Sequence, residues 1–488
     1  MKVLLIEPPY ERFVGFRSEW YPMGLTSIAT YLAGMGYEAR VYHAEHGHDT
    51  AYTSVVRYSQ QFNRYQAAIK DDANPVWQEI KAEIMRFEPD VIGLSVLTPK
   101  VPAAFKIAAL AKLIHPSVKI IAGGHHSTLL PEEMLSCSEI DFVIRGEGEE
   151  TVGELINAFG SGKADYSSIQ GISFVRNGKI FHTPERKLLN QLDSVPFPDR
   201  ERLLYLDTFT PVQLSMVMTS RGCPYRCGFC SSQNMWTRRV RFCSTSKVMQ
   251  EIKYLKENYR VKNITFMDDS FTINKKRIIN FCTALLGEHM DITWSCLTRV
   301  NTIDDDIIKV MKTAGCTKVD IGIESGNQRV LDLIHKDITL DEVRQAVRVL
   351  RKNDMFWSGF FMFGFPTETE QEVLDTLSFM KELRPDWTNI SVFTPYPGTP
   401  LFDLAQQKGM IPERPDYTLY SHQNIESRCT DTISPENFKQ LALKMFREVH
   451  TYNSSYRRLL KRALTRGYLN NPKLLFLDMQ KAIAWLKK

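Results

Sequence analysis

The chain has 488 residues, of which 43% are hydrophobic and 24% are charged, as in ordinary soluble globular proteins, so a disordered or fibrous chain is excluded. At about 150 residues per domain, the length predicts about three domains. Lys and Arg number 61 and Asp and Glu number 56, and the resulting net charge of +5 is too small to indicate nucleic acid as a partner.

The apolar residues are too dispersed for a membrane-spanning helix, which needs about 18 of them in succession. Nine cysteines, without the pattern of a secretion signal at the start of the chain, favour metal or redox chemistry over a disulfide scaffold. We therefore expect a cytoplasmic protein.

Residues 1–160 alternate short β-rich runs with helical patterns. Continuous apolar strands between helices are typical of a parallel sheet that is covered on both faces. We therefore predict an α/β fold that begins with a Rossmann-like domain. Its strands are expected at residues 2–6, 38–43, 91–96, 119–122 and 141–144, and its helices at residues 25–35, 103–113 and 149–159.

A hairpin signal at Asn177-Gly178 and a Pro-containing stretch mark residues 161–208 as a hairpin and linker. A second βα series follows over residues 209–410. Its six units predict a partial (β/α)6 TIM-type barrel with an active site at the C-terminal ends of the strands, and residues 411–488 are predicted to be mostly helical. The barrel strands are expected at residues 214–219, 263–267, 292–297, 318–323, 358–363 and 388–393, with helices at 247–259, 340–353 and 370–383.

The first barrel strand leads into three cysteines, Cys223, Cys227 and Cys230, with the spacing C-x3-C-x2-C. Three thiolates on one loop can hold three irons of a cubane iron–sulfur cluster, whose usual complement is four cysteines. The missing ligand leaves one iron open to a substrate. A zinc site is the alternative, but it needs a fourth ligand nearby, and the next cysteine, Cys243, lies thirteen residues on.

This loop, including the aromatic Phe229, resembles the signature of the radical S-adenosylmethionine (SAM) superfamily. The resemblance implies a 4Fe–4S cluster at Cys223, Cys227 and Cys230, with S-adenosylmethionine on the open iron and Phe229 along its adenine. It also implies a 5′-deoxyadenosyl radical that takes a hydrogen from the substrate, and an electron donor such as flavodoxin or ferredoxin.

Polar segments follow later barrel strands, where the cofactor would need them. The carboxylate of Asp268 or Asp269 would suit a cationic amino group, and Arg299 could hold a carboxylate bidentately. The segment with Glu324 and Ser325 resembles the superfamily segment that contacts the ribose and the carboxylate of the cofactor. The alternative is that these acids only cap the helices that follow them.

The strands of the first domain also end in glycine-rich loops, where ligands of open α/β sheets bind. Glycines let a phosphate or a large planar ring approach the backbone, and the absence of G-x-G-x-x-G argues against a nicotinamide cofactor. Ahead of a radical SAM barrel, this arrangement resembles the cobalamin-dependent branch, with its class B methyltransferases and anaerobic magnesium-protoporphyrin monomethyl ester cyclase-like proteins. The candidate cobalamin contacts are Gly24, Ser95, Thr98, Gly123, Gly124, His125, Gly146, Glu147 and Gly148.

The D-x-H-x-x-G motif, whose histidine ligates cobalt in cobalamin mutases, is missing from the sequence. Val143 stands where the histidine would follow Asp141. Cobalamin is therefore expected to lack a protein imidazole ligand. His125 and His126 are conceivable contacts, although a loop histidine is more often a plain polar residue.

Residues 456–488 carry nine basic residues against one acidic residue. Basic amphipathic helices there could lie on an anionic membrane surface, which would suit a lipid, isoprenoid or tetrapyrrole substrate and a membrane-peripheral location. The alternative is a solvated face packed on the barrel. No RNA-binding module follows the barrel, so no nucleic acid partner is expected.

Together these features predict an enzyme that methylates an unactivated carbon of a small-molecule or lipid-like substrate, with the methyl group taken from methylcobalamin. Oxidative cyclisation or ring rearrangement without methyl transfer is the second interpretation, because both outcomes occur among relatives. A non-catalytic corrinoid or iron–sulfur sensor is the third, but a sensor has no need for a cleavable cofactor.

Overall fold

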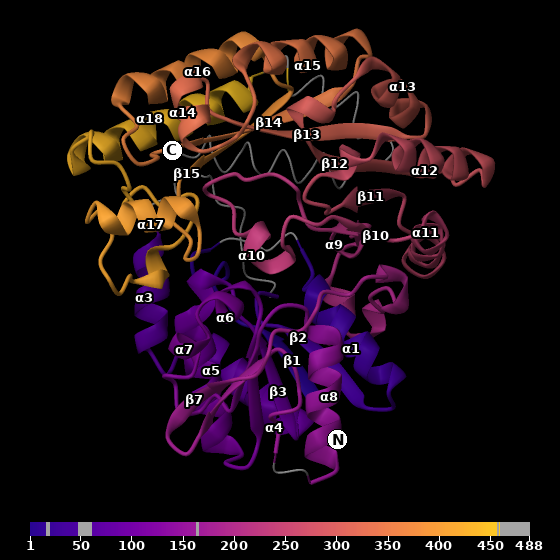
Figure 1. Ribbon diagram of the computed structural model, residues 1–488, viewed down its shortest axis with the longest axis vertical. Coiled ribbons are helices and arrows are strands. Elements are labelled where there is room, and N and C mark those ends of the chain that lie inside the picture. The colour runs from indigo at the N-terminus through magenta and orange to yellow at the C-terminus, as the bar shows by residue number, and fades with distance from the viewer. Residues whose placement is uncertain (16–19, 47–60, 163–164, 456–457, 459–488) are drawn as a thin grey trace.

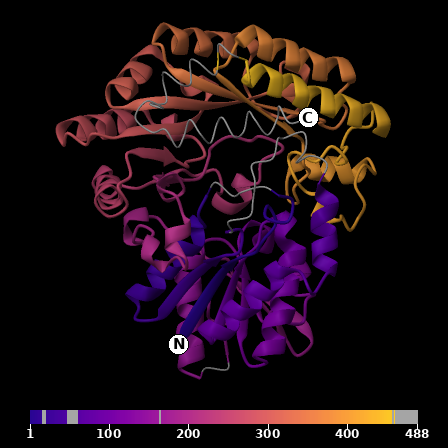
Figure 2. The same cartoon turned by 180° about the vertical axis from the view of Figure 1, so that it is seen from behind.

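The computed structural model describes residues 1–15, 20–46, 61–162, 165–455 and 458. Two α/β units are stacked along the long axis of the molecule, the first drawn in indigo to magenta and the second in pink to orange (Figure 1). The view from behind shows the same two stacked units (Figure 2). The predicted α/β class, with a Rossmann-like unit ahead of a partial barrel, is confirmed.

The first sheet has seven strands in the order β2-β1-β3-β4-β5-β6-β7, of which β1 to β5 are parallel. Helices α1 and α8 cover one face, and α3, α4 and α5 cover the other. The strand order reverses between β1 and β3, where sheets of this kind bind ligands. The elements are β1 (Lys2–Glu7), α1 (Met23–Gly34), β2 (Glu38–His43), α3 (Phe62–Lys70), α4 (Pro75–Phe87), β3 (Val91–Ser95), α5 (Val101–Ile114), β4 (Lys119–Gly123), α6 (His125–Leu129), α7 (Pro131–Met134), β5 (Phe142–Ile144), α8 (Gly148–Gly160), β6 (Ile172–Arg176) and β7 (Lys179–His182).

The predicted hairpin is present between β6 and β7. Asn177 and Gly178 both have left-handed φ angles, 52° and 72°, as a type I′ turn requires. Strand β6 pairs antiparallel with β5, so the hairpin extends the first sheet. The linker then returns to β2, where Leu203 forms a parallel bridge with Val41.

The second sheet has six parallel strands in the order β15-β14-β13-β12-β11-β8, which confirms the predicted partial (β/α)6 barrel. Strands β8 and β15 are its two edges, so the barrel is open. The elements are α9 (Pro211–Leu214), β8 (Met216–Val217), β9 (Ser220–Arg221), α10 (Ser232–Trp236), β10 (Arg241–Phe242), α11 (Thr245–Tyr259), β11 (Asn263–Phe266), α12 (Lys275–Gly287), β12 (Thr293–Arg299), α13 (Asp305–Thr313), β13 (Cys316–Glu324), α14 (Gln328–Leu333), α15 (Leu340–Lys352), β14 (Phe356–Phe363), α16 (Glu370–Leu383), β15 (Trp387–Val392), α17 (Pro400–Gln407) and α18 (Pro435–Asn453).

The first barrel strand is shorter than the prediction of residues 214–219. A capping box at Thr210 with proline at the next position starts helix α9, which takes Leu214. After β8, the backbone N–H of Thr219 donates to the Asp268 carboxylate, at 3.3 Å. Ser220 and Arg221 then pair antiparallel with β10. A side-chain acceptor thus replaces the neighbouring strand and turns the chain toward the cysteine loop.

Helix α18 closes the described part of the C-terminal region and packs on β15. The Asn453 side chain hydrogen-bonds both the N–H and the carbonyl of Thr388, at 3.0 and 2.8 Å. Apart from Arg458, the predicted basic amphipathic helices lie outside the described residues. Among the residues that are described, no helix combines the length and the apolar run needed to cross a bilayer.

An aromatic cluster forms part of the barrel core. Phe266 at the end of β11 is fully buried, and its ring centroid lies 4.6 Å from that of Phe271, 5.3 Å from Phe281 and 5.5 Å from Trp294. The first pair is stacked and the other two are edge-to-face, and aromatic pairs in these geometries add to the stabilisation from apolar burial.

We predict that Phe266→Ala lowers the free energy of unfolding by about 3–5 kcal/mol, because it leaves a cavity among rigid rings. Urea denaturation followed by circular dichroism measures the change. Leu286→Ala on helix α12 is the control, because the Leu286 side chain is 45% exposed and its loss should change stability by about 0.5 kcal/mol or less. Equal losses in the two variants would contradict the assignment of this cluster to the core.

Candidate functional site

The three predicted cysteines lie on the loop between β9 and α10, each partly buried and free of disulfides. The loop begins at Gly222, whose φ of 101° and whose close approach to the Arg239 carbonyl leave no room for a side chain. Burial raises the pKa of the Cys223 thiol and raises that of Cys230 to about 12. The loop therefore holds three thiols in a sheltered position at the barrel mouth.

Arg299, at the end of β12, reaches this loop. Its Nη1 lies 3.3 Å from the Cys227 sulfur, and its guanidinium lies 3.7 Å from the centre of the Tyr225 ring. The side chain is buried, and its Nε and Nη2 have no hydrogen-bond partner among the described residues. A buried cation with unused donors beside thiols fits an anionic group, such as cluster thiolates or a ligand carboxylate.

The zinc alternative gains no support from this arrangement. Within the described ranges, no three His, Cys, Asp or Glu side chains are placed to hold a single metal ion. The donor set of the loop, three thiols without a fourth protein ligand, instead fits a cluster with one open iron.

The two predicted carboxylates after β11 have different surroundings. Asp268 is buried, and its oxygens accept hydrogen bonds from the N–H of Thr219 and from the Thr219 and Ser220 hydroxyls. Asp268 thus binds the residues before the cysteine loop, whereas the sequence analysis predicts that it contacts the cofactor. Asp269 is exposed and accepts a hydrogen bond from Ser232 at 2.6 Å, which places its carboxylate beside the end of the cysteine loop.

The predicted Glu324, at the end of β13, is paired with Lys336, which sequence patterns did not reveal. Both are buried, and Lys336 Nζ lies 2.7 Å from Glu324 Oε1 and 5.9 Å from the centre of the Phe229 ring. A Cβ at Gly322 would lie within 3 Å of both charged groups, so a larger residue there would displace the pair. The pair thus lies against the predicted adenine-binding aromatic of the cysteine loop.

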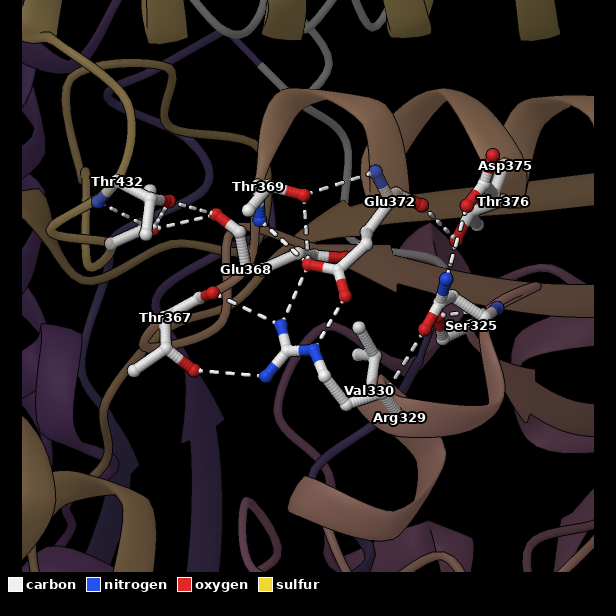
Figure 3. Close-up of polar contacts among 12 residues, drawn as sticks. Ser325, Arg329, Val330, Thr367, Glu368, Thr369, Glu372, Asp375, Thr376 and Thr432 are labelled. Carbon is white, nitrogen blue, oxygen red and sulfur yellow. Dashed lines mark hydrogen bonds and ion pairs between the residues drawn. The ribbon is translucent and has the colours of Figure 1, made fainter.

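Ser325 fastens its loop to helix α16 (Figure 3). Its hydroxyl lies 3.1 Å from the Thr376 hydroxyl and accepts the N–H of Asn327 at 3.1 Å. Beside it, Arg329 forms a bidentate ion pair with Glu372, at 2.5 and 2.6 Å. The contacts of Ser325 hold the backbone next to Glu324, so its observed role is structural.

The loop after β14 is closed by Glu368. One oxygen of its buried carboxylate accepts the N–H groups of Gly364 and Phe365, at 2.5 and 3.0 Å, and the backbone carbonyl accepts the hydroxyl of Thr432 (Figure 3). Burial raises the pKa of Glu368 to about 8, so the carboxyl is mostly protonated at neutral pH. This loop therefore holds its shape at the barrel mouth without adding a charge.

A cavity of about 350 Å³ lies between the two units. It extends from the strand ends of the first sheet along the sheet face beneath α1 and α8, and its wall is mostly apolar. Its far side is formed by barrel residues that include Arg221, Trp236 and Cys243. From the predicted cobalamin set it is lined by Gly24, Ser95, Gly123, Gly124, His125, Gly146, Glu147 and Gly148.

Thr98 and His126 do not line this cavity. His126 is fully buried, with Nδ1 3.3 Å from the Thr98 hydroxyl and Nε2 3.6 Å from Glu133. Thr98 is thus a partner of a core histidine, and its predicted contact with cobalamin is not supported. His125 faces the cavity, and burial lowers its pKa, so its imidazole is neutral.

The cavity and the cysteine loop meet at a cluster of buried charges. Arg221, two residues before the first cysteine, donates from Nη1 to Glu147 and from Nη2 to Glu149, each at 2.6 Å. Arg241 on the paired strand β10 donates to the second oxygen of Glu147 at 2.8 Å. Both guanidiniums lie within 6 Å of the centre of the Trp236 ring. The predicted Glu147 is therefore a junction between the two units as well as part of the cavity wall.

Two family models match the chain: the radical SAM superfamily over residues 217–380 and the B12 binding domain over residues 14–156. An uncharacterized methyltransferase of Pyrococcus horikoshii, PH0819, is 36% identical to this chain, with 84% of each chain covered. The chain belongs to the cobalamin-dependent branch of the radical SAM superfamily. Its cofactors are accordingly a 4Fe–4S cluster, S-adenosylmethionine and cobalamin, as predicted.

Two further matches span most of this radical SAM enzyme. The anaerobic magnesium-protoporphyrin IX monomethyl ester cyclase of Rubrivivax gelatinosus is 28% identical, over 86% of this chain and 72% of its own length. The structure of the methyltransferase TsrM from Kitasatospora setae, with cobalamin and a 4Fe–4S cluster bound, has a TM-score of 0.62 at 17% identity. The match covers 83% of this chain and 75% of the TsrM chain. At 17% identity, this match confirms the fold.

We predict that Glu149→Gln destabilises the protein by about 3 kcal/mol at neutral pH, because it leaves Arg221 with one carboxylate fewer. Burial raises the pKa of Glu149, but the Arg221 guanidinium and its hydrogen bonds lower it by more than burial raises it. The pKa of Glu149 therefore lies below its ordinary value. The stabilisation is therefore fully present above the unfolded-state pKa of about 4.3. It is lost as the pH falls through the lower folded-state pKa.

Urea unfolding of the wild-type and Glu149→Gln proteins between pH 3 and pH 7 tests this prediction. The difference between them should be constant near neutrality and should shrink in acid. Glu154→Gln on the same helix is the control, because Glu154 pairs with Arg186 at the surface, where an ion pair contributes about 1 kcal/mol or less. A pH-independent difference for Glu149→Gln would contradict the prediction.

Proposed function

We propose that this enzyme transfers a methyl group from cobalamin to an unactivated carbon of a small-molecule or lipid-like substrate. The observation that supports this most directly is the shared interface, where the cavity of the B12-binding unit and the cysteine loop of the barrel meet at Arg221. When bound, the cluster and S-adenosylmethionine supply a hydrogen-abstracting radical, and cobalamin supplies the methyl group.

Within this proposal, Cys223, Cys227 and Cys230 ligate the cluster, and Arg299 neutralises negative charge beside Cys227. The Asp269 carboxylate accepts from the amino group of S-adenosylmethionine, since it is the exposed acid beside the loop.

Glu324 accepts from the ribose hydroxyls of S-adenosylmethionine, while Lys336 fixes the orientation of the Glu324 carboxylate and Phe229 packs on the adenine. The cavity between the sheet and helices α1 and α8 receives cobalamin, and its glycines leave room for a planar ring. These assignments follow from charge and donor type at each position.

A second candidate is oxidative cyclisation without methyl transfer, which the similarity to the magnesium-protoporphyrin cyclase of Rubrivivax gelatinosus favours. Both reactions would use the same cluster loop and cobalamin cavity. They differ in whether S-adenosylmethionine is also consumed as a methyl donor, which product analysis separates. For either reaction we propose a flavodoxin- or ferredoxin-type electron donor and, for an apolar substrate, membrane-peripheral contact through the basic residues 456–488.

The deciding experiment is anaerobic. The reconstituted enzyme is incubated with cobalamin, S-adenosylmethionine, a reductant and a cell extract of its own source, and two nucleosides are quantified by mass spectrometry. Equal, extract-dependent amounts of 5′-deoxyadenosine and S-adenosylhomocysteine are expected for methyl transfer. 5′-Deoxyadenosine alone would overturn it in favour of cyclisation or rearrangement.

We predict that Cys230→Ala abolishes 5′-deoxyadenosine formation, because two thiolates cannot hold the site-differentiated cluster. The same variant should lose the iron-dependent absorbance of the reconstituted protein. Cys282→Ala is the control, since Cys282 is buried in the barrel core and away from the loop. Radical formation by Cys230→Ala would refute the ligand assignment.

We predict that Glu324→Gln and Lys336→Gln each weaken S-adenosylmethionine binding by about 10-fold or more, as expected when a hydrogen bond to a charged group is lost. Equilibrium binding to the reconstituted protein measures the change. Arg329→Gln breaks the neighbouring exposed pair with Glu372 and should leave the affinity within about 2-fold, since surface ion pairs contribute little. Equal losses in all three variants would indicate a general loss of structure instead.

A further inference from the structure

We propose that Arg221 couples the two cofactor sites, so that occupancy of the cobalamin cavity changes the affinity of the cysteine loop for its own ligands, and the reverse. Arg221 would act as a positioning residue for both cofactors. This inference rests on the two cofactor sites and not on methyl transfer, so it can fail or succeed independently of the reaction that the enzyme catalyses.

On the cavity side, Arg221 is bonded to residues 146–149, which end the loop after β5 and begin helix α8. Gly146, Glu147, Gly148 and Glu149 all line the cavity. A Cβ on Gly148 would lie 2.8 Å from the Ile28 side chain, so the start of α8 is packed tightly against α1. A ligand that fills the cavity must press on residues 146–149, and the two carboxylates bonded to Arg221 belong to this segment.

On the barrel side, Arg221 is the last anchored residue before the cysteines. Gly222 follows it with a left-handed φ and a backbone approach that excludes any side chain, and Cys223 comes next. The preceding Thr219 and Ser220 are held by Asp268. The start of the cysteine loop is therefore held from the barrel by Asp268 and from the first unit by Glu147 and Glu149.

Trp236 completes the connection at the other end of the loop. It follows Cys230 by six residues, lines the cavity and packs against the Arg221 guanidinium at 5.6 Å. Arg221, directly before the cysteine loop, and Trp236, in the helix after it, thus contact each other. Both side chains form part of the cavity wall. Two sites that share a positioning element are coupled through it, and the coupling must be reciprocal.

The test measures hydroxocobalamin affinity, by quenching of tryptophan fluorescence, in full-length protein with and without its reconstituted cluster. In the wild-type protein we expect cluster reconstitution to tighten binding by about 5-fold or more, the lower end of common coupling factors. S-Adenosylmethionine, bound to cluster-containing protein, should gain affinity when cobalamin is added. Two affinity ratios are compared: hydroxocobalamin with and without the cluster, and S-adenosylmethionine with and without cobalamin. In Arg221→Gln both ratios should fall to within about 2-fold of 1, whatever the absolute affinities are.

Arg186→Gln is the matched control. Arg186 also binds two carboxylates of helix α8, Glu150 and Glu154, but it contacts neither the cavity nor the cysteine loop, so this variant should keep the wild-type ratios. Arg221→Lys keeps the positive charge, but a lysine cannot span two carboxylates, so this variant should also lower the ratios. It replaces Arg221→Gln in the test if Arg221→Gln does not fold. A wild-type ratio near 1, or wild-type ratios in both Arg221 variants, would overturn the proposal.

Discussion

Four charged side chains, three of them buried and Arg221 partly buried, hold the units of this protein together where they meet. Glu147 and Glu149 come from the first unit, and Arg221 and Arg241 come from the barrel. A buried charge without a counter-charge is among the most destabilising features that a fold can contain. Charge balance, in addition to apolar burial, sets the relative position of the two units.

The consequence for the site is that two parallel sheets present their strand ends to one shared interface (Figures 1 and 2). The loops of the first sheet carry glycines, His125 and Glu147, and those of the second carry thiols, Asp269 and Arg299. Ligands of parallel α/β sheets bind outside the carboxyl ends of the strands. The shared interface thus brings the proposed cobalamin cavity next to the proposed cluster loop.

Sequence patterns predicted the features that have local causes. Helix α16 has the predicted bounds, and it begins with a capping box formed by Thr369 and Glu372. Features made by residues distant in the chain were missed. Lys336 forms an ion pair with Glu324, from which it is separated in sequence by a helix and a turn. Arg221 forms an ion pair with Glu147, 74 residues earlier in the chain. Thr98 resembled its glycine-rich neighbours in sequence, but its hydroxyl lies beside buried His126.

The charge cluster also limits how such proteins recombine during evolution or in protein engineering. A chimera that joined this barrel to a B12-binding unit with neutral residues at the two glutamate positions would bury Arg221 without a counter-ion. That mismatch would cost about 3–5 kcal/mol, a large part of the stability of a typical domain. Replacing the first unit of this protein therefore requires a donor whose residues at positions 147 and 149 complement the charges of Arg221 and Arg241.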